Sequence, residues 1–136
     1  MTKPWIAAYN LPTTSWTSGG TRLDYDDQHY DIFEVQATSH DDATRAARAM
    51  RQAQVRLTAA QKALLAALIE SIPASCDPAA KLGRLIEVEP AESRAAAALA
   101  RKGLLSVFDP DTLQVRLSIT AFNPSILALV AAEAPA

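Results

Sequence analysis

The sequence contains a single cysteine, Cys76, among its 136 residues. One thiol cannot form an internal disulfide, and the chain has no CxxC motif and no Cys/His cluster with the spacing of a metal site. It also lacks any apolar run that approaches the roughly 20 residues of a membrane-spanning helix. We therefore expect a cytoplasmic protein in a reducing compartment that binds no metal or other cofactor and does not enter a membrane.

A surplus of positive charge, which is usual in dedicated nucleic-acid-binding domains, is missing as well. The chain has 13 Lys and Arg residues against 15 Asp and Glu residues, for a formal net charge of −2. This balance does not exclude DNA binding, because a local basic face can be enough. Aromatic residues are few, at 6%, whereas 49% of the chain is hydrophobic. The many alanines then predict a core of Ala, Leu, Ile and Val with closely packed helices.

Residues 1–56 are predicted to form a small β-β-α module. The first strand is expected at residues 5–9, and residues 12–20 are rich in Thr, Ser and Gly, which is typical of a loop. In residues 30–38 apolar and polar side chains alternate, which indicates a second strand with one buried face. The acidic side chains before and within this strand would bind a cation or imitate phosphates toward a basic partner, but we favour a solvent-exposed patch. They are Asp24, Asp26, Asp27 and Asp31.

A helix is expected to follow at residues 40–56, because Ser39 is a good N-cap. Alanines share one face of this helix with Met50, and Ala53 is predicted to be among them. The arginines lie opposite this face or at its edge, and form a secondary basic face. That face would bind phosphates or an acidic partner, or is simply the solvated side of an amphipathic helix. It consists of Arg45, Arg48, Arg51 and Arg56.

The second module, residues 57–136, is predicted to open with helices. Thr58 is the expected N-cap of the first, at residues 59–71. A second helix is expected from Pro78 to about residue 85 or 86, with Asp77 as its cap, since Asp and then Pro favour a helix start. A short last helix is expected to begin after Asn123.

Between these helices the sequence predicts a third helix and a hairpin. The third helix is expected at residues 91–102, because Gly103 suits the left-handed conformation that often follows a helix. Residues 105–108 and 113–119 flank a turn, and the second arm alternates apolar and polar side chains with a period of two. Such a hairpin would bury one face and leave the other in solvent.

Two segments of this module carry a resemblance to a known family. Residues 88–94 read Val-Glu-Pro-Ala-Glu-Ser-Arg, and residues 99–105 read Leu-Ala-Arg-Lys-Gly-Leu-Leu. Together they resemble the recognition helix and its exit in MarR-like bacterial transcription regulators. Residues 109–111 resemble the tip of the wing, and residues 117–120 resemble the strand that closes it. The resemblance covers under half of the chain. It implies a winged helix-turn-helix, with three helices and a β-hairpin wing, within an α+β chain.

The resemblance also implies that the third helix enters the major groove of DNA. On this hypothesis the chain is a small transcription regulator that binds double-stranded DNA. Arg94 would approach base edges, whereas Lys102 and Arg116 would contact phosphates. Alternatively, these are only solvated charges on a helix and a hairpin. The full set of predicted DNA-binding residues is Ser93, Arg94, Arg101, Lys102 and Arg116.

Several residues depart from the pattern of these regulators. Residues 95–98 are all alanine, where such regulators carry polar or basic side chains. Glu89 and Glu92 place negative charge at the start of the third helix. Thr112 and Leu113 occupy the wing region, which usually presents Arg. The first module does not resemble the long terminal helices through which MarR-like proteins dimerise.

These departures motivate a second hypothesis of a different class. The winged helix would bind a protein partner rather than DNA, as in an adaptor or an inhibitor carried by a phage or mobile element. The alanines at residues 95–98 would let another helix or backbone approach closely. A homodimer is a third alternative. No side chains have the spacing of a nucleophile with its base, so we predict no catalytic residue and no enzyme activity.

Overall fold

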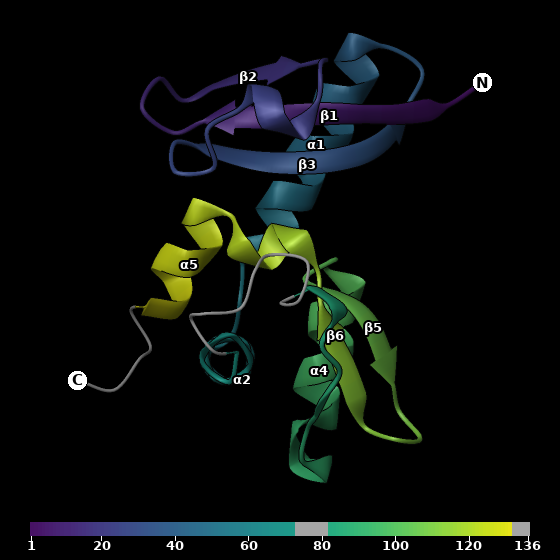
Figure 1. Ribbon diagram of the computed structural model, residues 1–136, viewed down its shortest axis with the longest axis vertical. Coiled ribbons are helices and arrows are strands. Elements are labelled where there is room, and N and C mark those ends of the chain that lie inside the picture. The colour runs from purple at the N-terminus through teal and green to yellow at the C-terminus, as the bar shows by residue number, and fades with distance from the viewer. Residues whose placement is uncertain (73–81, 132–136) are drawn as a thin grey trace.

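The computed structural model describes residues 1–72 and 82–131 and shows a mixed α+β fold (Figure 1). Two three-stranded antiparallel sheets organise the chain, with strand orders β2-β1-β3 and β4-β6-β5. Each sheet contributes to its own hydrophobic cluster, one formed by residues up to 50 and the other by residues from 55 onward. We call these halves the N-terminal unit and the C-terminal unit.

The sheet of the N-terminal unit has one strand more than the sequence indicates. Strands β1 (Lys3–Asn10) and β3 (Tyr30–Ala37) pair along their full length, as expected for the two predicted strands. Strand β2 (Ser15–Ser18) lies in the segment predicted as a loop and pairs with the other edge of β1. Its Trp16 ring packs 5.1 Å from the ring of Tyr9 and 5.9 Å from that of Phe33. The predicted β-β-α order is therefore wrong, because the unit contains three strands before its helix. Aromatic packing holds the additional strand in the sheet, although its composition is typical of a loop.

Helix α1 (His40–Gln54) covers one face of this sheet and then continues to the C-terminal unit (Figure 1). The Ser39 hydroxyl accepts a hydrogen bond from the Asp42 N–H, which confirms the predicted N-cap. Ala43 and Ala47 are fully buried against the sheet, as their spacing predicts. Ala53 is exposed, contrary to prediction, and the neighbouring Gln54 is buried instead. The last turn of α1 packs against the C-terminal unit rather than against the sheet. A different side of the helix is therefore buried in this turn.

The C-terminal unit packs helices against the second sheet. Helices α2 (Ala59–Glu70), α4 (Ser93–Arg101) and α5 (Pro124–Ala131) surround a core made almost entirely of aliphatic side chains. The predicted capping box of α2 is confirmed, because Thr58 and Gln61 each accept a hydrogen bond from the other's backbone N–H. The largest fully buried residues of this core are Leu65, Leu99, Leu104, Val115, Leu117 and Ile126.

The predicted hairpin is present and gains a third strand. Strands β5 (Leu105–Asp109) and β6 (Gln114–Leu117) pair, with Val115 and Leu117 buried. Strand β4 (Ile86–Glu87) pairs with the other edge of β6, where the sequence predicted the end of a helix. The part of that predicted helix before residue 82, together with Cys76, lies outside the described residues. The second arm was expected to reach residue 119 but stops at Leu117, since a 3-10 helix η3 (Ile119–Phe122) follows.

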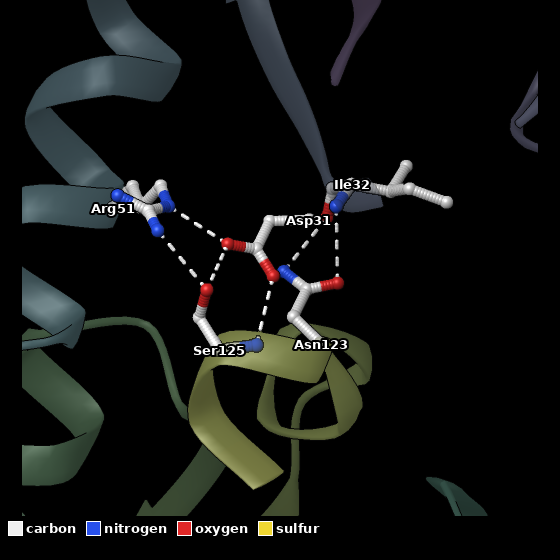
Figure 2. A network of polar contacts seen from close by, with 5 residues as sticks. All are labelled: Asp31, Ile32, Arg51, Asn123 and Ser125. Atoms are coloured by element: carbon white, nitrogen blue, oxygen red, sulfur yellow. Dashed lines mark hydrogen bonds and ion pairs between the residues drawn. The ribbon is translucent and has the colours of Figure 1, made fainter. Parts of the chain in front are cut away.

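The two units are joined by a buried polar network (Figure 2). Asp31, at the start of β3, is only 1% exposed, so its place in the predicted solvent-exposed patch is wrong. Its carboxylate accepts hydrogen bonds from Arg51 Nε at 2.7 Å, from the Ser125 N–H at 3.0 Å and from the Ser125 hydroxyl at 2.5 Å. A carboxylate at the first turn of α5 is favoured by the partial positive charge of that helix end. Asp31 therefore ties α1, β3 and α5 together.

A second contact at the same junction closes part of the open edge of β3. The Asn123 side-chain oxygen accepts the Ile32 N–H at 3.0 Å, and its amide donates to the Ile32 carbonyl at 3.1 Å (Figure 2). The amide thus replaces a neighbouring strand at this one residue. Both partners are buried, so loss of this pair would leave polar backbone atoms of β3 unsatisfied.

Candidate functional site

Helix α4 is the element around which the predicted site is built. A 3-10 turn η2 (Pro90–Glu92) precedes it, and the Glu92 side chain accepts a hydrogen bond from the Glu89 N–H at 2.8 Å. The many alanines of α4 favour a helix, because alanine loses no side-chain entropy in one. It ends before Gly103, whose φ of +81° is left-handed, and the Leu104 N–H then closes back on the Leu99 carbonyl.

One side of α4 is buried and the other is presented outward. Ala96 and Leu99 are fully buried and belong to the core that α2 also lines. Arg94 and Arg101, seven residues apart, are exposed, and Ala97 between them is half-buried. A spacing of seven residues corresponds to two turns, so both guanidinium groups share one face of the helix. The expected outward presentation of this helix is therefore present in the structure.

A groove runs between the first turns of α4 and the turn of the β5–β6 hairpin. Pro90, Ala91, Ser93, Arg94 and Ala97 form one wall. Phe108 and Pro110 form the other wall. The lining is largely apolar, and the Arg94 side chain brings its one positive charge. We call this feature the α4–wing groove.

The hairpin turn that flanks the groove has a defined backbone. Leu113 has a φ of +59°, which is unusual for a branched side chain, and its N–H donates to the Asp109 carbonyl. The Leu113 carbonyl in turn accepts the Val88 N–H at 2.8 Å. The Asp109 side chain accepts a hydrogen bond from the Asp111 N–H at 2.9 Å. These bonds fix the turn relative to the segment that leads into α4.

The structure separates the five residues predicted to bind DNA. Ser93 and Arg94 lie together in the groove, and Arg101 is exposed farther along α4. Lys102 instead points toward α2, where its ammonium group donates to the Arg56 carbonyl and to the Gln61 side-chain oxygen. Arg116 is half-buried, and its Nε atom is buried without a hydrogen-bond partner in the described part of the chain. Two of the five, Arg94 and Arg101, thus present exposed charge.

Acidic residues outnumber these exposed arginines around the groove. Glu89 precedes Pro90 in one wall, and Asp109 and Asp111 flank Pro110 in the other. Hydrogen bonds from the Asp111 N–H and from Thr112 lower the pKa of Asp109, so this carboxylate is charged at neutral pH. These three carboxylates thus neighbour the lining residues in the chain, whereas Arg94 is the one charged residue in the lining itself.

The secondary basic face on α1 loses one of its four members. Arg45 and Arg48 are exposed on the helix, and Arg56 is exposed just beyond it. Arg51 turns away from them to the buried Asp31 carboxylate and lies 4.1 Å from the centre of the Tyr9 ring. The sequence placed Arg51 only at the edge of this face. Its partners Tyr9, Asp31 and Ser125 come from β1, β3 and α5, which the helical period cannot indicate.

Sequence reasoning missed the apolar walls of the groove. Phe108 was expected only as part of a strand, and Pro110 only as part of a turn. The alternation of the hairpin arms gives the face of each residue but not its distance from α4. The wall is formed by tertiary packing between two elements that are separate in the chain.

No protein family model, no curated protein and no solved structure matches this chain. Among residues 1–72 and 82–131, no helix has the length and apolar character needed to cross a membrane. The same residues contain no group of three or more His, Cys, Asp or Glu side chains arranged to hold a metal ion.

Proposed function

We propose that the C-terminal unit is a winged-helix module that binds a protein partner in the α4–wing groove. Three features support the winged-helix assignment: α4 presents one face outward, a β-hairpin lies beside it, and α2 packs behind it. The hairpin would be the wing, and β4 would add a third strand to it.

The observation that carries the choice of a protein partner is the chemistry of the groove. Its walls are proline, alanine and phenylalanine, and such surfaces gain free energy when apolar side chains of a partner cover them. The small side chains Ala91 and Ala97 allow close approach of another backbone. The acidic rim favours a segment with Lys or Arg beside its apolar residues, because complementary charges speed association. The same rim would repel a phosphate backbone.

The experiment combines a groove variant with a matched surface variant. Ala97→Tyr places a large side chain in the groove, and Ala53→Tyr places the same side chain at an exposed position of α1. The protein is cross-linked to partners in its native cells, and the recovered partner is purified and titrated against both variants. We expect Ala97→Tyr to abolish binding, Ala53→Tyr to bind like the wild type, and binding to weaken with salt. Equal affinity of the two variants would refute the groove as the binding surface.

DNA binding is the second candidate function, and the pair Arg94 and Arg101 favours it. On a helix they lie about 10 Å apart along the axis, a distance that suits contacts with two positions in one major groove. A mobility-shift assay with duplex fragments at low salt tests it, with Arg94→Ala as the site variant and Arg45→Ala as the control. Salt-sensitive binding that Arg94→Ala alone weakens would support DNA as the ligand; absence of any complex at low salt would end this candidate.

If the chain binds DNA, we expect it to do so as a homodimer, like other regulators that bind two half-sites. Light scattering of the purified chain measures its mass in solution directly. A dimer would supply two copies of α4, as two half-sites of DNA require. A monomer would leave the single groove as the unit of recognition.

A further inference from the structure

A separate cavity of about 390 Å³ lies between the two units. The N-terminal unit contributes Arg22 from the 3-10 helix η1 (Arg22–Asp24), and Asp27 and Gln28 from the segment that follows. The C-terminal unit contributes Ile119 and Phe122 from η3 and Leu127 from α5. In Figure 1, α5 lies below the N-terminal sheet, on the side of the molecule where the units meet. The volume is at the small end of the range for ligand sites in proteins.

The part of the cavity formed by the C-terminal unit is apolar. Ile119 and Leu127 are each 38% exposed, and both line this one cavity. Two large apolar side chains that are left accessible in one concave site are a common sign of a ligand surface. A bound apolar group would remove this area from water.

The part formed by the N-terminal unit carries charges of both signs. Arg22 is half-buried, and within the described residues its guanidinium group makes no hydrogen bond. Burial lowers the pKa of Arg22, whereas the charges of Glu34 and Asp27 act in the opposite direction. Neither carboxylate forms a close ion pair with it in the described part of the chain. The guanidinium donors are therefore open to an anion, and Asp27 offers an exposed carboxylate on the same side.

The third polar side chain at the junction is already engaged. Asn123 lines the cavity, but both atoms of its amide are bonded to the Ile32 backbone. The groups that remain for a ligand are the Arg22 donors, the Asp27 carboxylate and the Gln28 amide. These three groups, one positive, one negative and one neutral, share the cavity with the apolar side chains of Ile119, Phe122 and Leu127.

From this arrangement we propose that the cavity binds a small zwitterion with an apolar side chain, such as an apolar α-amino acid. The ligand carboxylate accepts hydrogen bonds from Arg22, the ammonium group donates to Asp27, and the side chain covers Ile119, Phe122 and Leu127. Planar guanidinium is well suited to a carboxylate, because it can form two parallel hydrogen bonds. The ligand touches both units and so stabilises the folded chain when it binds.

The first test measures how much the ammonium group and the carboxylate of the ligand each contribute to binding. L-phenylalanine, 3-phenylpropanoate and phenethylamine share the same apolar group, but the second lacks the ammonium group and the third lacks the carboxylate. Each is titrated into the full chain by calorimetry and in thermal melts, up to about 10 mM, which detects millimolar affinity. We expect L-phenylalanine to bind and to raise Tm, and both analogues to bind about tenfold more weakly or worse.

The second test places the site by substitution. Arg22→Met removes the group that binds the ligand carboxylate, and Asp27→Asn removes the negative charge that binds the ammonium group, at an exposed position. Arg84→Met serves as the control, because Arg84 is exposed and does not line the cavity. Both site variants should lose affinity by about tenfold or more while the control binds like the wild type.

Three results would overturn the proposal. These are no binding of L-phenylalanine by the wild type, equal binding of phenylalanine and its two analogues, or unchanged affinity in Asp27→Asn. Because no variant alters the α4–wing groove, these outcomes are independent of the test of partner binding.

Discussion

Asp31 is the single residue on which the junction of the units depends most. Its carboxylate is buried and accepts hydrogen bonds from Arg51 and from two groups of Ser125. In Asp31→Asn the charge is lost and the new NH₂ group faces donors, so Arg51 is left without its counter-ion. We expect a loss of about 2–4 kcal/mol in the free energy of unfolding, measured by urea denaturation.

The matched control for this change is Asp41→Asn, in the first turn of α1. Asp41 is exposed and interacts only with the positive end of the helix, so its replacement should cost about 1 kcal/mol at most. If the two substitutions lower the unfolding free energy by the same amount, the Asp31 network does not stabilise the junction.

Helix α4 depends on the way it ends. Gly103 has a φ of +81°, and a Cβ atom added there would lie 3.4 Å from the Gln54 side-chain nitrogen, which donates to the Lys102 carbonyl. Gly103→Ala forces an L side chain into the left-handed region, while the new Cβ atom meets Gln54 only at ordinary contact distance. The expected cost is about 1–2 kcal/mol, read from the midpoint of chemical denaturation.

Gly83→Ala provides the comparison within the same unit. Gly83 has no positive φ, and a Cβ atom there would meet no heavy atom within 4 Å. Alanine reduces the freedom of the unfolded chain, so this change should be neutral or mildly stabilising. A destabilisation of Gly83→Ala as large as that of Gly103→Ala would show that the left-handed helix end is not the cause.

Elements with a local signal were predictable from the sequence. Helices α1 and α2 begin at the predicted N-caps, Ser39 and Thr58, because capping hydrogen bonds involve residues only three apart. Strand β2 was missed because nothing in its four residues alternates, and its place is set by the tilted packing of the Trp16 ring on Tyr9 and Phe33. Strand β4 has two residues, too few for any periodicity to appear.

The residues of the candidate site also differ in how far the sequence could predict their surroundings. Arg94 and Arg101, which the resemblance implied as DNA-binding residues, are exposed on α4. The resemblance could not show that Lys102 is bonded to Arg56 and Gln61, which are more than 40 residues away in the chain. The burial of Asp31 was unpredictable for the same reason, since its partner Ser125 is 94 residues distant. Long-range partners decide which charges are free to bind anything.

Taken as one molecule, the chain has two hydrophobic clusters joined by hydrogen bonds of buried polar residues. Gln54 donates to Lys102 and Thr120, Asp31 binds Ser125, and Asn123 pairs with Ile32. Separate clusters could unfold one after the other, but opening this junction would expose several buried polar groups at once. We therefore expect the two units to unfold together, as one cooperative transition.

The chain carries a built-in probe for this expectation, because its only two tryptophans, Trp5 and Trp16, lie in the N-terminal sheet. Tryptophan fluorescence therefore reports on the N-terminal unit, whereas far-UV circular dichroism reports mainly on helices, of which α2, α4 and α5 belong to the C-terminal unit. In urea the two signals should change at the same midpoint for the wild type.

In Asn123→Ala, which leaves the Ile32 N–H and carbonyl without their partner, the two midpoints should separate by a resolvable amount. Separate midpoints already in the wild type would mean that the hydrogen bonds across the junction do not couple the units, whereas coincident midpoints in Asn123→Ala would assign the coupling to Asp31 and Gln54.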